Sequence, residues 1–303
     1  MDSLVSVNGK IASPEDSVIS VLDRGFLFGD NVFEVFVAFG DKVLDLKPHL
    51  RRLRQSAEMH RMEIPWSDEE LSFEINTLVS QCASKKKYVR LVITRGNGIG
   101  LGIPENPSLN RVIYCLPAQI EKQANIESGV SLARRQANFI ERGAGAKTGN
   151  YIRSITALEK ARNEGFDDVL WSNSDQEITE ATTSNIFLIG REGDLVEIAT
   201  PPATSGLLLG ITRSRIIELL NNAKIHVTER VISTEEIPRF DEGFLCSTVR
   251  GLIPIKGIDK HRLHTCRKNS VFQHIQRLYN TWVATEIGYR VDWNTGDKAK
   301  DES

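Results

Sequence analysis

The stretch Val32–Leu46, VFEVFVAFGDKVLDL, decides the fold class of the first part of the chain because it predicts an antiparallel hairpin. Its β-branched and aromatic residues run up to Gly40 and Asp41, two residues that favour a turn, and a second β-prone run follows. The next residues, PHLRRLRQSAEMHRM, place Leu50 and Leu53 at helical spacing. A hairpin that leads directly into an amphipathic helix is typical of an α+β domain.

Similar patterns lie on both sides of this stretch. The segment VSVNGKIA has Asn8 and Gly9 between two short β-prone runs, which predicts a further hairpin. Ser67 and Glu70 form a capping box before a second helical segment, and the runs YVRLVIT and RVIYCLPA predict two more strands. We therefore predict a small N-terminal domain over residues 1–117, with antiparallel strands and helices on one side.

The remainder of the chain predicts a second, larger domain over residues 129–303. The hydrophobic pattern lapses at residues 118–128, which we expect to be an interdomain linker, and a charged tail at about 295–303 is expected to be disordered. Short strands then alternate with turns. Helices are expected at Tyr151–Asn163, Ile211–Asn222 and Asn269–Ala284.

Length and composition favour a two-domain globular protein. The chain has 303 residues, 40% of them hydrophobic, and a formal net charge of -2. This balance argues against nucleic acid or an anionic membrane as a partner, and no apolar run reaches the roughly 18 residues of a membrane span. The basic cluster Lys85–Lys87 is expected to form a solvated turn.

The cysteines and histidines do not predict a disulfide or a metal site. The four cysteines are widely spaced and include no C-x-x-C pair, which favours free thiols in a reducing compartment. His261, His264 and Cys266 lie near one another in the sequence, but without an orderly ligand pattern. We expect a cytoplasmic protein that binds no metal.

Lys147 stands among small residues in GAKTGNY, directly before a predicted helix. A lysine in such surroundings can be desolvated, which lowers the pKa of its amine and makes it a nucleophile for carbonyl chemistry. A surface lysine in a flexible Gly-rich loop has the same local sequence. The stretch by itself leaves both interpretations open.

Three other segments could bind a cofactor. Ile211 and Thr212 open a predicted helix whose free N–H groups would suit a phosphate, although most helix starts bind nothing. Ser247 and Thr248 interrupt an apolar strand, where their hydroxyls could hold a phosphate or simply begin a polar turn. Glu180 could pair with a protonated pyridine nitrogen or be a turn residue.

Taken together, these segments resemble the fold-type IV aminotransferases that depend on pyridoxal 5′-phosphate (PLP). This family includes branched-chain aminotransferases, D-amino-acid transaminases and aminodeoxychorismate lyases. The similarity covers nearly the whole chain. Its motifs occur in family order: DRGFLFGDNVFE, HLRRL, AKTGNY, EITEATTSNIF, GITR and CSTVRGLIPI.

The resemblance implies a role for each matching residue. Lys147 corresponds to the lysine that forms a Schiff base with PLP. Tyr151 corresponds to the tyrosine at the O3′ oxygen of the cofactor, and Glu180 to the carboxylate at its pyridine nitrogen. Arg52 corresponds to the phosphate-binding arginine, and Arg51 is the alternative in a shifted register.

The remaining cofactor contacts follow from the same resemblance. Leu208 stands in the place of the leucine that packs against the ring. Ile211 and Thr212 match the phosphate-binding helix start, and Ser247 and Thr248 complete it.

The family fold has a small N-terminal α+β domain and a larger C-terminal PLP-binding domain with a β-barrel-like core flanked by helices. The family is dimeric, with a loop of the partner subunit closing each site, which implies a homodimer with its active site at the subunit interface. The implied reaction is a ping-pong transamination between an amino acid and a 2-oxo acid. Lys147 would move the proton as general base and acid.

The substrate is indicated less clearly by the motifs. DRGFLFGDNVFE narrowly favours D-amino acids, yet Phe33 stands where the typical D-amino-acid enzyme has a carboxylate-binding tyrosine. Tyr88 and Arg90 instead resemble a pair found in branched-chain enzymes, and they share one face of a strand. Arg250 is a further candidate for the α-carboxylate, and Arg153 could reach the pocket or lie on a helix surface. A branched-chain L-amino-acid aminotransferase, an (R)-amine transaminase and an aminodeoxychorismate lyase are the alternatives.

Overall fold

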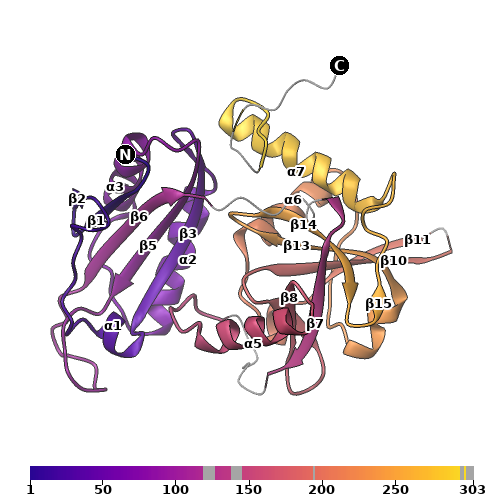
Figure 1. Cartoon of the computed structure of the whole chain (residues 1–303), viewed down its shortest axis with the longest axis horizontal. Coiled ribbons are helices and arrows are strands. Elements are labelled where there is room, and N and C mark those ends of the chain that lie inside the picture. Colours follow the sequence, from indigo (N-terminus) through magenta and orange to yellow (C-terminus); the bar gives the residue numbers. More distant parts are fainter. Residues whose placement is uncertain (119–126, 138–144, 194, 294–296, 298–303) are drawn as a thin grey trace. The chain divides into compact units, whose positions relative to one another are not determined.

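The computed structural model describes residues 1–118, 127–137, 145–193, 195–293 and 297. Most of the expected linker at 118–128 and of the expected tail at 295–303 lies outside these residues. The contacts divide the chain into two units (Figure 1). Unit 1 comprises Met1–Ile120, Ala146–Asn150 and Val283–Ser303, and unit 2 comprises Glu121–Gly145 and Tyr151–Trp282.

This grouping assigns two segments differently from the domain ranges expected from the sequence. Residues Ala146–Asn150, which include Lys147, are grouped with the N-terminal part of the chain, as are the residues from Val283 onward. The range of each domain stays a prediction, and each unit is described below by itself.

Unit 1 is built on an antiparallel sheet with the strand order β2-β1-β6-β5-β3-β4 (Figure 1). The two hairpins predicted from the sequence are confirmed, since β1 pairs with β2 across Asn8 and Gly9, and β3 pairs with β4 across Gly40 and Asp41. Asn8 and Gly9 have φ angles of 52° and 89°, the left-handed values that this turn requires. The strands are β1 Leu4–Val7, β2 Lys10–Ala12, β3 Asn31–Phe39, β4 Lys42–Val43, β5 Lys86–Thr94 and β6 Asn110–Pro117.

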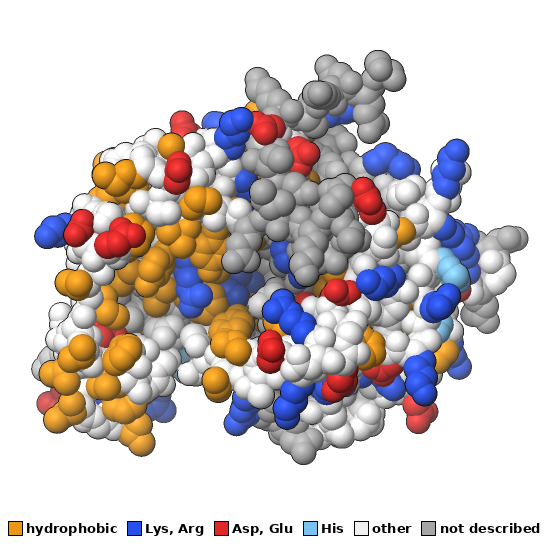
Figure 2. Space-filling view, viewed as in Figure 1, with side chains coloured by type: hydrophobic (Ala, Val, Ile, Leu, Met, Phe, Trp, Pro, Cys, Tyr) orange, Lys and Arg blue, Asp and Glu red, His pale blue; other side chains and the backbone are white. Residues whose placement is uncertain are grey.

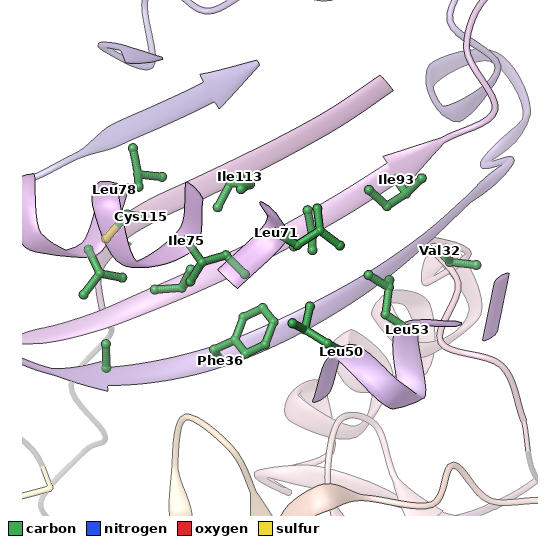
Figure 3. Packing of buried hydrophobic residues seen from close by; sticks show 14 of the residues in the cluster. Val32, Phe36, Leu50, Leu53, Leu71, Ile75, Leu78, Ile93, Ile113 and Cys115 are labelled. Atoms are coloured by element: carbon green, nitrogen blue, oxygen red, sulfur yellow. The ribbon is translucent and has the colours of Figure 1, made fainter. Parts of the chain in front are cut away.

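Two helices cover one face of this sheet, as the sequence predicted. They are α2 Leu46–Met59 and α3 Asp68–Gln81, and the capping box of Ser67 and Glu70 begins the second. Figure 3 shows their apolar side chains, for example those of Leu53 and Leu71, in one buried cluster with side chains of the sheet such as Ile93. Because side chains alternate along a strand, Tyr88 and Arg90 of β5 lie on the opposite face of the sheet from Ile93.

The solvated turn expected at Lys85–Lys87 is wrong. β5 begins at Lys86, and the side chain of Lys87 is only 2% exposed. Its ammonium group donates hydrogen bonds to the carbonyl oxygens of Gly40 at 2.6 Å and of Val79 at 2.8 Å. Val79 lies in the last turn of α3, where its carbonyl oxygen also accepts a hydrogen bond from the N–H of Cys82 at 3.3 Å, so Lys87 supplies a second donor at the end of the helix. The burial of this cation depends on tertiary contacts that a run of three lysines does not reveal.

Unit 2 contains a mixed, curled sheet with the strand order β12-β11-β10-β13-β14-β7-β8-β9, and β15 pairs with β14. The pairings of β7 with β8 and with β14 are parallel, whereas β10 and β13 are antiparallel. The strands are β7 Val130–Gln136, β8 Asp168–Ser172, β9 Ile178–Ala181, β10 Asn185–Glu192, β11 Leu195–Thr200, β12 Thr228–Glu229, β13 Phe240–Ser247, β14 Gly251–Ile258 and β15 His261–Arg262.

The helices predicted in the second part of the chain are confirmed with small shifts of their ends. They are α5 Ile152–Asn163, α6 Ile211–Asn222 and α7 Val271–Ile287. The mixed composition of helices and sheets is the α+β class expected from the sequence. Within the described part of the chain, no helix is long and apolar enough to cross a membrane, and no group of acidic, histidine and cysteine side chains could hold a metal ion.

Candidate active site

Lys147 lies beside the start of β3 in unit 1. The N–H of Phe33 donates to the carbonyl oxygen of Lys147 at 3.0 Å, and Val32 forms a β-bridge with Thr148. The N–H of Lys147 donates to Oγ of Ser56, on α2, at 3.1 Å. The backbone on both sides of the lysine is therefore fixed by main-chain contacts that do not depend on its side chain.

Gly149, two residues after Lys147, allows a close approach between two chain segments. A Cβ added to Gly149 would lie 2.6 Å from Oδ1 of Asn31, closer than such atoms approach in real structures. Gly29, which has a φ of 68°, leaves the same kind of space for Asn150. The small residues around Lys147, which suggested a loop, allow two chain segments to pack closely.

The amine of Lys147 and the guanidinium group of Arg90 both contact the ring of Phe33. Nζ of Lys147 lies 4.6 Å from the centre of the Phe33 ring, and Cζ of Arg90 lies 3.9 Å from the same centre. Phe33 is 2% exposed, and Tyr88 and Arg90 are half-buried. Among the described residues, no acidic side chain forms an ion pair with Arg90. Unit 1 thus brings the predicted Schiff-base lysine together with a cation that could bind a substrate carboxylate.

Of the two candidate phosphate arginines, Arg51 is exposed and Arg52 is not. The side chain of Arg52 is 11% exposed and donates two hydrogen bonds of 2.7 Å to the carboxylate of Glu34, which is fully buried. Arg52 also lies one helical turn before Ser56, the residue that contacts Lys147. The assignment of the phosphate to Arg52, with Arg51 as the alternative, stays a prediction.

A buried polar cluster behind Arg52 was not predicted from the sequence. Burial alone would raise the pKa of Glu34, but the hydrogen bonds from Arg52 and from Nδ1 of His49, at 2.7 Å, hold it at about 2. Burial lowers the pKa of His49 against the attraction of Glu34, which favours the neutral imidazole. The sequence does contain one indication of this cluster. Glu34 lies on the same face of β3 as the core residues Val32 and Phe36, where an apolar residue would be expected.

In unit 2, Glu180 is held at the end of β9. Its Oε1 accepts a hydrogen bond from the N–H of Leu208 at 3.2 Å, and its Oε2 accepts one from the amide of Asn185 at 3.2 Å. Leu208 and Glu180 are therefore neighbours, and their predicted contacts with the cofactor ring stay predictions. Asn185, like Glu34, was not among the predicted site residues.

The helix start predicted to bind phosphate is present. Gly210 is the N-cap of α6 and has no side chain that could cap the helix, and the first turn, which contains Ile211 and Thr212, has no acidic residue. Such a terminus presents N–H groups to an anion. Cys246 of β13 pairs with Asn185, and Ser247 and Thr248 follow it at the end of that strand.

For the other predicted site residues, the structure gives the exposure or the neighbours of each. Arg250 lies 3.8 Å from the carboxylate of Asp168, so it has an acidic neighbour that Arg90 lacks among the described residues. Arg153 is exposed on α5, which favours a place on the helix surface. Tyr151 is half-buried and is the N-cap of that helix.

The chemistry of these donor groups fits PLP. In unit 1, the amine of Lys147 and the guanidinium group of Arg52 match its aldehyde and its phosphate. In unit 2, the carboxylate of Glu180 and the start of α6 match its pyridine nitrogen and its phosphate. The groups divide between the two units: Arg52 and Lys147 belong to unit 1, and Glu180 and α6 belong to unit 2.

Comparisons with known proteins agree with this assignment. The family model described as class IV aminotransferase matches residues 31–258. The branched-chain-amino-acid aminotransferase of Escherichia coli is 29% identical over 284 residues, which cover 90% of each chain. The D-alanine aminotransferase of Listeria monocytogenes is 29% identical over 288 residues, covering 94% of this chain and 97% of the relative. A crystal structure of the E. coli branched-chain enzyme superposes with a TM-score of 0.83 at 25% identity, covering 98% of this chain and 96% of the other.

The fold and the comparisons define a PLP-dependent enzyme that transfers amino groups. The chain belongs to the class IV aminotransferase family.

Proposed function

We propose that this aminotransferase moves the amino group of a branched-chain L-amino acid to a 2-oxo acid, with Arg90 as the residue that binds a substrate carboxylate. The observation that carries the proposal is the shared contact of Arg90 and Lys147 with the Phe33 ring, at 3.9 Å and 4.6 Å. A cation so close to the reacting amine can hold a carboxylate while the amine acts on the adjacent carbon.

The chain's own residues would divide the remaining tasks. PLP supplies, when bound, an electron sink that acidifies the Cα–H of the substrate. Nζ of Lys147 would take the proton from Cα as general base and then, as general acid, deliver it to the C4′ carbon of the cofactor, so it must reach the substrate in its neutral form. Glu180 would hold the ring nitrogen protonated. Arg52 and the first turn of α6 would hold the phosphate.

A preference for D-amino acids is the second candidate, and DRGFLFGDNVFE and the similarity to the Listeria D-alanine aminotransferase support it. Both candidates use the same cofactor residues. They differ in which face of the substrate carbon must meet Lys147, which depends on where the carboxylate binds. The position of Arg90 therefore matters more than the cofactor site for this choice.

A half-reaction screen separates these candidates. The PLP-loaded enzyme is mixed with L-leucine, D-alanine, D-glutamate or (R)-1-phenylethylamine without an acceptor, and loss of the visible cofactor band is followed. We expect L-leucine to react fastest. Arg90→Met should slow L-leucine by about 10- to 100-fold, the loss expected for one charged hydrogen bond, and leave the carboxylate-free amine unchanged.

Three other outcomes of the screen would contradict the proposal or favour another activity. An equal loss for amino acid and amine would contradict the role of Arg90. A faster reaction with D-alanine would favour the second candidate. Formation of 4-aminobenzoate and pyruvate from aminodeoxychorismate without an acceptor would identify a lyase.

We further propose that the protein forms a homodimer through an apolar surface of unit 1. Two exposed segments are held together there by the hydrogen bonds from Arg24 N–H to Gly96 O and from Gly98 N–H to Leu22 O. Figure 2 shows hydrophobic side chains gathered over this region, at the lower left near α1 (Arg24–Phe28). A contiguous apolar surface of this kind usually marks a protein interface. Its exposed members are Val18, Ile19, Val21, Leu22, Phe26, Leu27, Phe28, Ile99, Leu101 and Ile103.

Sedimentation tests the dimer. The wild-type protein should sediment at twice the chain mass of 33.9 kDa, and Phe26→Asp combined with Leu101→Asp should sediment as a monomer. Phe73, on the outside of α3 and 74% exposed, provides a control, because Phe73→Asp adds the same charge outside the surface. A wild-type monomer, or a dimer unchanged by the double substitution, would contradict this interface.

A further inference from the structure

Asn185 links Glu180 to the segment that leads into α6. Its side-chain amide nitrogen donates to the carbonyl oxygen of Leu208 at 2.9 Å and to Oε2 of Glu180 at 3.2 Å. The N–H of Leu208 donates in turn to Oε1 of Glu180. The three residues therefore form a closed set of hydrogen bonds in which each oxygen of the carboxylate is held.

The other side of the Asn185 amide touches the start of α6. A Cβ added to Gly210, the N-cap of that helix, would lie 1.9 Å from Oδ1 of Asn185. Asn185 itself is 6% exposed and is the first residue of β10. One rigid side chain thus lies against both Glu180 and the helix start, and its own backbone is fixed in the sheet.

Asparagine suits this position because both groups that its nitrogen faces are acceptors. A side-chain amide has two N–H donors on one nitrogen, so it can serve a carbonyl and a carboxylate together. An aspartate of the same shape would present only acceptors and, when ionised, a like charge to Glu180. Serine could donate one hydrogen bond, not two.

We propose that Asn185 is a positioning residue that sets the spacing between Glu180 and the start of α6. In the proposed site, Glu180 contacts the ring nitrogen of PLP and the start of α6 contacts its phosphate. This inference rests on the proposed roles of Glu180 and of the first turn of α6. Asn185 touches neither end of the cofactor in this role; it fixes Glu180 and the helix start relative to each other. A correctly spaced pair binds both ends of a rigid cofactor without reorganisation.

The test compares Asn185→Asp with a matched control, Asn173→Asp. Asn173 is also buried, and its amide donates to the carboxylate of Glu177 at 2.8 Å and to the carbonyl oxygen of Ser205 at 3.4 Å. Both substitutions therefore exchange the same donor for a carboxylate beside a glutamate. PLP is titrated into each apo protein, and the melting temperature of the apo form is measured separately.

We expect both variants to melt at lower temperature, and only Asn185→Asp to bind PLP about 10- to 100-fold more weakly. The absorption maximum of the bound cofactor should also shift in that variant, because Glu180 no longer faces the ring nitrogen in the same orientation. Asn185→Ser, which keeps one donor, should lie between the wild type and Asn185→Asp. It also carries the test if the aspartate variant fails to fold.

Glu180→Gln separates this inference from the proposed function. If Glu180→Gln weakens PLP binding and shifts its absorption while Asn185→Asp behaves like Asn173→Asp, the positioning role is overturned and the site stands. If neither Glu180→Gln nor Asn185→Asp affects PLP, the placement of Glu180 is overturned and the inference with it. If the proposal is right, the double variant should lose less affinity than the product of the two single losses.

Discussion

Replacement of Lys147 by alanine should abolish transamination. We expect the rate of the half-reaction to fall by about 10,000-fold or more, since the variant loses both the covalent attachment of PLP and the group that moves the proton at Cα. Stopped-flow measurement of the cofactor band with the best amino donor gives the rate. Reduction with borohydride followed by peptide mapping should attach the cofactor to Lys147 in the wild type only.

The fold of this variant should be intact. The contacts that fix residue 147 to Phe33 and Ser56 are made by its backbone, so alanine can keep them. Lys160→Ala is the control, because Lys160 is an exposed lysine in the last turn of α5. A Lys147→Ala protein that still turns over, or a Lys160→Ala protein that does not, would remove Lys147 from its assigned role.

Arg52→Ala should weaken PLP binding and destabilise unit 1, while Arg51→Ala should do neither. Loss of Arg52 leaves the buried carboxylate of Glu34 without its bidentate partner. Removing one member of a buried ion pair lowers the free energy of unfolding by about 3–5 kcal/mol. Loss of charged hydrogen bonds to phosphate should raise the Kd of PLP by about 10- to 100-fold. Urea unfolding and PLP titration measure the two effects separately. A larger effect from Arg51, the exposed neighbour, would support the alternative register.

The stability lost with Arg52 should depend on pH. In the wild type, the pKa of Glu34 lies at about 2, below its ordinary value of 4.5, so its contribution is present above pH 4.5 and is lost as the pH falls toward 2. That contribution is about 3 kcal/mol. Without Arg52, burial raises the pKa of Glu34, and protonation then relieves the unpaired charge. The difference in unfolding free energy between wild type and Arg52→Ala should therefore shrink from pH 7 to pH 3, whereas a constant difference would contradict the pairing.

The sequence by itself determined most of the secondary structure. Local rules suffice where neighbouring residues decide the outcome: the Asn8-Gly9 turn, the capping box at Ser67 and the apolar spacing of Leu50 and Leu53. The family resemblance, carried by six motifs in order, also predicted the family to which the chain belongs. These features depend on contacts between residues a few positions apart, or on motifs that can be read directly.

Only the tertiary structure decided how polar side chains are paired. Lys87 looks like a surface residue in a basic run, yet the end of α3 and the turn at Gly40 bury it. Glu34, His49 and Asn185 were overlooked because their partners lie on other elements: Arg52 on the helix after a hairpin, and Leu208 23 residues beyond Asn185. A polar group in the interior is stable only when distant segments supply its hydrogen bonds, so its role appears only once the chain has folded.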